Sequence, residues 1–99
     1  MNIKINSVKF VANKKLEDFV NGKVKKLMQF YDDIIFADVY LKLENTQDLN
    51  NKVTEIRLEI PGNDLFVKKQ SNTFEKSTDN AVNALKRQIT KHKEKLRGQ

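Results

Sequence analysis

This chain contains no cysteine, one proline and three glycines among its 99 residues. Without cysteine it can form neither a disulfide framework nor a thiolate metal site. The N-terminal residues are polar and charged where a signal peptide would need an apolar core, and no later stretch is apolar for long enough to cross a membrane. We therefore expect one cytoplasmic domain over residues 1–99, without a second core.

Positive charge is concentrated near the C-terminal end of the sequence. Residues 76–99 hold seven Lys or Arg and two acidic residues, a balance of +5, whereas residues 1–75 hold twelve and eleven, a balance of +1. A face that needed charge only for solubility would mix the two signs more evenly, so this concentration favours a polyanionic partner. Nucleic acid is the leading candidate, and an acidic protein or an anionic membrane surface is the competitor.

Apolar residues recur at three- and four-residue spacing in two segments, and each predicts a helix. The first helix is expected at residues 14–30, with Asn13 as its N-cap and Phe30 or Tyr31 closing its inward stripe. The second is expected at residues 76–99, with an inward sector formed by Thr78, Ala81, Val82, Leu85, Ile89, His92 and Leu96. Both borders of that sector are basic: one holds Arg87, Lys91 and Lys95, and the other holds Lys86, Lys93 and Arg97.

Alternation of apolar and polar residues predicts four strands, at residues 3–6, 35–43, 54–60 and 65–72. The second strand is expected to bury one face, formed by Ile35, Ala37, Val39, Leu41 and Leu43. Polar residues 45–51 are typical of a hairpin loop, and residues 61–64 (Pro-Gly-Asn-Asp) of a turn. The order of elements predicts an α+β domain with two layers (βαβββα), in which both helices pack on one face of a four-stranded sheet.

Residues 85–96, which read Leu-Lys-Arg-Gln-Ile-Thr-Lys-His-Lys-Glu-Lys-Leu, resemble the ribosome hibernation promoting factor family. This family is also called ribosome-associated inhibitor or sigma-54 modulation protein. Residues 16–20 (Leu-Glu-Asp-Phe-Val), the residues that follow them as far as Asp33, and the strand at 34–43 are similar to the family as well. The resemblance covers essentially the whole chain, although residues 74–77 (Phe-Glu-Lys-Ser) lack the family's frequent aromatic-Ala-Ala pattern.

The resemblance implies a domain that binds the small ribosomal subunit, competes with messenger and transfer RNA for their channel, and inhibits translation in starvation or stationary phase. It also implies that ribosomal RNA is contacted by Lys23, Lys26, Lys86, Arg87, Lys91, His92, Lys93 and Lys95. The chain resembles the short form of the family, so we expect no C-terminal dimerisation domain. No cofactor, metal, small-molecule substrate or membrane partner is expected.

The residues themselves leave other interpretations open. A basic helix on a two-layer domain also fits a general double-stranded RNA binding module, or a solvated surface without a partner, whereas the well-patterned strands argue against a membrane-surface helix. His92 borders the apolar sector, where a structural role is at least as reasonable as an RNA contact, and alone it cannot anchor an ordinary metal site.

Catalysis and base stacking by the strands receive less support. Neither a nucleophile nor a phosphate loop accompanies Asp32 and Asp33, so the sequence does not indicate an enzyme. Phe36 and Tyr40 fit a cross-strand or helix-covering role better than base stacking, because the aromatic-rich signature of single-strand binders is missing.

Overall fold

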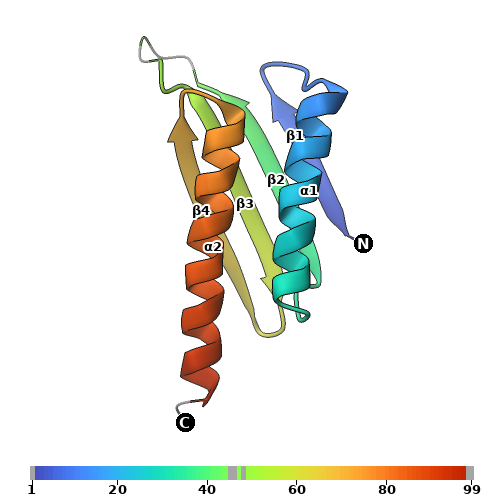
Figure 1. The fold of residues 1–99 in the computed structure, drawn as a ribbon, viewed down its shortest axis with the longest axis vertical. Helices are drawn as coiled ribbons and strands as arrows, with labels where there is room; N and C mark the ends of the chain where they lie inside the picture. Colours follow the sequence, from blue (N-terminus) through green and yellow to red (C-terminus); the bar gives the residue numbers. More distant parts are fainter. Residues whose placement is uncertain (1, 45–46, 48, 98–99) are drawn as a thin grey trace.

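The structure, a computed structural model, describes residues 2–44, 47 and 49–97. Its elements follow the predicted order, which confirms the βαβββα architecture (Figure 1). They are β1 (Ile3–Val8), α1 (Lys14–Phe30), β2 (Phe36–Leu43), β3 (Lys52–Ile60), β4 (Asn63–Ser71) and α2 (Phe74–Arg97).

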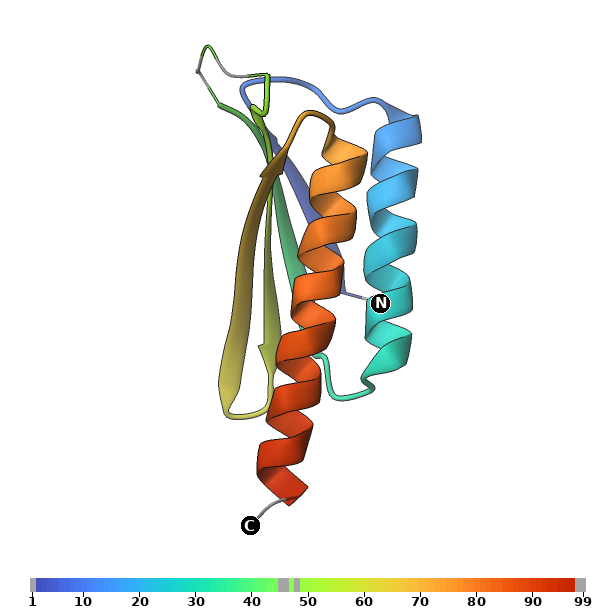
Figure 2. The ribbon, with the colours of Figure 1, turned by 60° about the vertical axis from the view of Figure 1, so that its left-hand side comes forward.

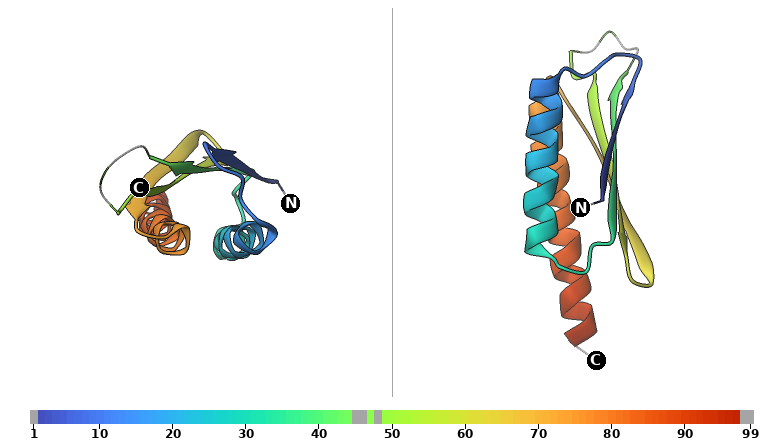
Figure 3. Two further views of the ribbon diagram at one scale, coloured as in Figure 1. Left: turned by 90° about the horizontal axis from the view of Figure 1, so that it is seen from above. Right: turned by 90° about the vertical axis from the view of Figure 1, so that its right-hand side faces the viewer.

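The four strands form one mixed sheet in the order β1-β2-β3-β4. β1 pairs in parallel with β2 because α1 crosses over between them, and the β2–β3 and β3–β4 pairs are antiparallel hairpins. Both helices lie on the same face of the sheet, and the other face is left uncovered by any helix (Figure 3). This arrangement confirms the predicted two layers.

The core lies between the sheet and the helices. One row of apolar residues crosses the sheet in register, formed by Ile5, Val39, Ile56 and Val67. The helices contribute fully buried residues opposite the sheet, namely Val20, Val24 and Leu27 from α1, and Ala81, Leu85 and Ile89 from α2. Burying a side chain such as Leu or Ile stabilises a fold by about 1.5–3 kcal/mol, so this layer accounts for much of the stability.

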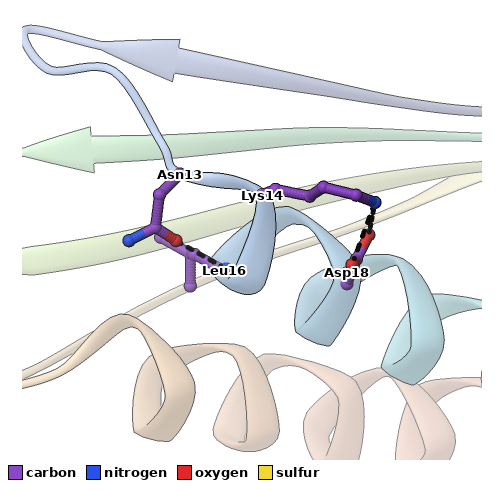
Figure 4. Close-up of polar contacts among 4 residues, drawn as sticks. All are labelled: Asn13, Lys14, Leu16 and Asp18. Atoms are coloured by element: carbon purple, nitrogen blue, oxygen red, sulfur yellow. Dashed lines mark hydrogen bonds and ion pairs between the residues drawn. The ribbon is translucent and has the colours of Figure 1, made fainter.

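The start of α1 is set by a side-chain cap. Asn13 Oδ1 accepts a hydrogen bond from the backbone N–H of Leu16 at 2.8 Å, which confirms the predicted N-cap (Figure 4). Across the first turn of the helix, the ammonium of Lys14 lies 3.2 Å from the carboxylate of Asp18. These contacts fix where the helix begins and leave its apolar stripe facing the sheet.

One predicted inward position is wrong. Ile35 is 47% exposed although its backbone N–H already donates to the Glu59 carbonyl of β3 at 2.8 Å, and Ile34 rather than Ile35 packs into the core before β2 begins at Phe36. Of the two residues considered for the end of the α1 stripe, Phe30 is 45% exposed, and Tyr31, the C-cap residue, packs against the core as predicted. The aromatic ring at the end of α1 is therefore available to solvent.

Several boundaries differ from the predictions by a few residues. The last hairpin turns through Pro61 and Gly62 alone, with Gly62 at φ 77°, so β4 begins at Asn63. α2 begins at Phe74 because the Thr73 hydroxyl accepts the backbone N–H of Lys76 at 3.1 Å. Of the predicted loop at 45–51, residues 45, 46 and 48 lie outside the described part of the chain.

A buried cluster of hydroxyls joins the first turn of α2 to β3. Thr54 Oγ1 lies 2.7 Å from Ser77 Oγ and 3.2 Å from Thr78 Oγ1, and all three residues are fully buried. Ser77 Oγ also donates to the Phe74 carbonyl at 3.2 Å. This is the segment that lacks the aromatic-Ala-Ala pattern, and the hydroxyls hold it against the sheet by hydrogen bonds.

Thr54→Val is therefore expected to lower the free energy of unfolding by about 1–3 kcal/mol, because it removes the hydroxyl at the centre of the cluster and leaves a buried partner unsatisfied. Urea denaturation measures this. Adding Thr78→Val should recover part of the loss, since the unsatisfied Thr78 hydroxyl is then removed and Ser77 keeps its bond to the Phe74 carbonyl. Thr90→Val, at an exposed position of α2, is the control and should change stability by less than about 0.5 kcal/mol. Equal effects of Thr54→Val and Thr90→Val would contradict the role of the cluster.

Candidate nucleic-acid interface

The two helices lie side by side and run in the same direction, and α2 continues past the end of α1 (Figures 1 and 2). The C-terminal end of α1 is consequently beside the second half of α2, where most of the predicted RNA-binding residues lie. The last turn of α1 has no basic residue of its own. Lys86 and Lys93 from α2 bring positive charge to the last residue of that turn, Phe30, near the negative end of the helix dipole.

Lys86 and Lys93 surround the exposed aromatic ring at the end of α1. Their ammonium nitrogens lie 5.9 and 5.4 Å from the Phe30 ring centroid, and that of Lys93 lies 5.7 Å from the Tyr31 centroid. These distances are in the range of cation–π attraction. They also confirm the prediction that Lys86 and Lys93 share one border of α2, which is the border next to α1.

Two predicted residues of α1 lie on the face that turns toward α2. Lys23 forms an ion pair with Asp79 of α2 at 3.1 Å, and its ammonium is 5.4 Å from the Phe19 ring. Lys26 is exposed and, by its spacing, lies on the same helix face between Lys23 and Phe30. We call the resulting strip between the helices the seam: Lys23, Lys26 and Phe30 from α1, and Lys86 and Lys93 from α2.

Arg87, Lys91 and Lys95 form a second group, which we call the outer row, and all three are exposed. Arg87 and Lys91 line a hollow on the outward side of α2 together with Lys86 and Thr90. Arg87 also lines a polar hollow on the β4 side, whose other lining residues are Lys69, Asn80 and Asn83. Lys69 was not predicted, because nothing in its strand pattern indicates that β4 lies beside this part of α2.

His92 is half-buried and packs against Tyr31, with the two rings edge to face at a centroid distance of 6.4 Å. Burial, followed by the nearby Asp33 carboxylate, raises the pKa of Tyr31 above its ordinary value. This contact gives His92 a place in the packing between the helices. An RNA contact by His92 stays a prediction.

The uncovered face of the sheet differs in charge from the helix layer. Its charged residues are of both signs and form ion pairs, between Lys42 and Glu55 at 3.0 Å, Arg57 and Asp64 at 2.9 Å, and Lys68 and Glu44 at 3.8 Å. Such a surface offers little net charge to a polyanion. The helix layer, with the seam and the outer row, is therefore the candidate interface.

Phe36 and Tyr40 also lie on this uncovered face, since the alternate residues of β2 are the buried ones. The helix-covering role considered for them is therefore wrong. Lys42 places its ammonium 5.9 Å from the Tyr40 centroid, so Tyr40 contributes to the surface of the sheet. Among the described residues, no helix has the length and apolar character needed to span a membrane.

The fold and the charged layer together define a class: small two-layer βαβββα domains with a basic helix layer. A family model described as "Sigma 54 modulation protein / S30EA ribosomal protein" matches residues 3–97. The chain belongs to this family, which confirms the resemblance seen at residues 85–96.

Curated relatives support the same assignment. The chain is 30% identical to the ribosome hibernation promoting factor of Klebsiella oxytoca over 82 residues, which covers 83% of this chain and 82% of the relative. Identity to the factor of Escherichia coli K12 is 30% over 97 residues, or 98% of this chain and 96% of the relative. The Bacillus subtilis ribosome hibernation promotion factor is 32% identical over 98 residues, which covers 97% of this chain and 50% of the relative.

Solved structures share the fold. A ribosomal subunit interface protein from Coxiella burnetii superimposes with a TM-score of 0.84 at 17% identity, covering 94% of this chain and 98% of that structure. The N-terminal domain of Protein Y from Thermus thermophilus gives a TM-score of 0.77 at 24% identity, covering 93% and 99%. At these identities the comparison concerns the fold alone.

Proposed function

We propose that this protein is a ribosome hibernation factor that binds the small ribosomal subunit in the channel for messenger and transfer RNA and inhibits translation in starvation or stationary phase. The observation that carries the proposal is the basic helix layer in a member of this family. The proposed contacts to ribosomal RNA are the residues predicted from the sequence: Lys23, Lys26, Lys86, Arg87, Lys91, His92, Lys93 and Lys95.

The proposed mechanism is occupancy held by electrostatic attraction. Lys and Arg side chains neutralise RNA phosphates and release the counterions condensed on them, which favours binding most strongly at low salt. Phosphate contacts of this kind fix the position of a protein without reading bases, so the shape of the site decides where the domain binds. The sheet then fills space that messenger and transfer RNA need, and no chemical step is required.

The geometry ranks the proposed contacts. Asp79 already neutralises Lys23 in part, and the Lys23 side chain is only 37% exposed. Lys26, Lys91 and Arg87 are exposed to solvent and can approach phosphates without rearrangement of the fold. We therefore expect α2 and Lys26 to dominate the electrostatic attraction, and Lys23 to matter less.

The direct test titrates the purified protein against empty small subunits and against subunits that already hold messenger RNA and initiator transfer RNA. Occupancy predicts at least a tenfold weaker affinity for the filled subunits, and inhibition of translation in vitro that is stoichiometric with ribosomes. A long RNA duplex is the control ligand. Equal affinity for empty and filled subunits would overturn the channel proposal, and equal affinity for the duplex would favour a general double-stranded RNA binding module.

A further inference from the structure

Phe30 stands out among the residues of the seam, because it is a large apolar side chain that the core does not use. Its ring is 45% exposed, and the inward stripe of α1 is completed by Tyr31. The ring is therefore not part of the hydrophobic core. The ring is nevertheless held in a defined place, since Lys86 and Lys93 from α2 approach it to within 5.9 and 5.4 Å.

The other exposed aromatic rings have a different setting. Phe66 is 53% exposed and lies on the uncovered face of the sheet, where its register partner Arg57 is paired with Asp64. In the described part of the chain, no carboxylate is paired with Lys86 or Lys93. Phe30 thus combines an accessible ring with adjacent cations that have no acidic partner among the described residues.

We propose that Phe30 is a stacking platform for an unpaired RNA base, and that Lys86 and Lys93 neutralise the phosphates of the same strand. This inference rests on the proposed function, since it takes RNA as the partner of the helix layer. It adds the class of ligand, which is a single-stranded nucleotide rather than a duplex. A base in a duplex is stacked on both faces, so only an unpaired base can offer a face to Phe30.

The chemistry of the seam suits such a ligand better than an acidic protein segment. An acidic side chain would use the two ammonium groups but would gain nothing from the flat ring between them. A nucleotide uses the ring as well as the ammonium groups, because its base supplies a π-face for the ring and its phosphate supplies negative charge for the lysines. When a base covers the ring, the two long lysine side chains can turn their ammonium groups from the ring to the phosphates.

The first test measures binding of a short single-stranded RNA that contains 2-aminopurine, whose fluorescence is quenched by stacking. The wild type should quench it, and Phe30→Leu should bind about 5- to 100-fold more weakly, as expected for loss of a base–aromatic stack. Phe30→Trp should keep both binding and quenching. Phe66→Leu is the matched control, with the same substitution at a ring of similar exposure, and should behave as wild type.

Salt dependence separates stacking from charge. Phe30→Leu should lower the affinity without changing the slope of log K against log salt, because no phosphate contact is lost. Lys86→Gln with Lys93→Gln should instead reduce the slope by about one to two. Thermal melting of each variant shows that the fold is intact. The platform is disproved by wild-type RNA binding and quenching in Phe30→Leu, by absence of quenching with the wild type, or by stronger binding of an acidic peptide than of the RNA.

The same variants assayed on empty small subunits distinguish this inference from the proposed function. If the wild type and Phe30→Leu bind the subunits equally well, the function stands and the platform is wrong. If the wild type fails to bind subunits but quenches the single-stranded RNA through Phe30, the platform stands and the ribosomal function is wrong. A loss with Phe30→Leu that Phe30→Trp restores supports both.

Discussion

Replacing Arg87, Lys91 and Lys95 together by glutamate is expected to weaken binding to the small ribosomal subunit by roughly a hundredfold or more at moderate salt. The three reversals subtract six charges from a formal net charge of +6, which leaves the chain neutral overall. They also place carboxylates where the outer row would meet phosphates. Binding is measured by co-sedimentation with purified subunits at several salt concentrations.

The salt series identifies the physical cause of the loss. If each residue of the outer row contacts one phosphate, the slope of log K against log salt should decrease by about three. The melting temperature should stay close to that of the wild type, because the three side chains are exposed.

A second triple variant gives a control with the same change in net charge. Lys4, Lys9 and Lys15 are exposed residues outside the seam and the outer row, and reversing them to glutamate also leaves the chain neutral. If position matters, this control should retain most of the affinity that the outer-row variant loses. Equal losses in the two variants would show that net charge alone governs binding, and wild-type binding by the outer-row variant would exclude α2's outer side as the contact surface.

The fold was largely predictable because its local signals agree with one another. The three- and four-residue spacing of Val20, Val24 and Leu27 defines the inward side of α1, and Asn13 marks its start. Alternation in β2 identifies Ala37 and Val39 as buried. With one crossover helix and two hairpins, few topologies remain, and the observed sheet is the simplest of them.

Periodicity was insufficient where contacts come from distant segments. Val53 and Thr54 are neighbours in β3 and both are fully buried, although alternation allows only one of them to face the helices. Thr54 lies on the predicted inward side with Ile56 and Leu58 and meets hydrogen-bond partners there from Ser77 and Thr78, more than twenty positions away, whereas Val53 is buried on the opposite side of the strand. A hydroxyl cluster of this kind has no apolar pattern in the sequence, and so the start of α2 was predicted too late.

The candidate site was predicted as a set of charges but not as an arrangement. The sequence indicates which border of α2 holds Lys86 and Lys93, yet it does not show that Phe30 of α1 lies beside them. Nor does it show that Asp79 pairs with Lys23. Both facts depend on how two helices with no local connection pack side by side, which charge counts and spacing do not determine.

Substitutions inside α2 should act in a different way from those on its surface. Leu85 and Ile89 are fully buried at the centre of the inward sector. Leu85→Ala or Ile89→Ala is expected to lower the free energy of unfolding by about 2–5 kcal/mol, since each removes buried methyl groups and leaves a cavity. In a domain of this size the melting temperature should fall by roughly 10–30 °C.

Calorimetry or urea denaturation measures this effect, and Leu49→Ala is the matched control. Leu49 is 82% exposed, so the same loss of side-chain volume there should change stability by less than about 0.5 kcal/mol. The folded fraction of each core variant should bind small subunits with the wild-type salt slope, because no basic side chain has been removed. An unchanged denaturation midpoint for both Leu85→Ala and Ile89→Ala would mean that this face of α2 does not pack against the sheet. The assignment of the opposite side as the RNA-binding surface would then be wrong as well.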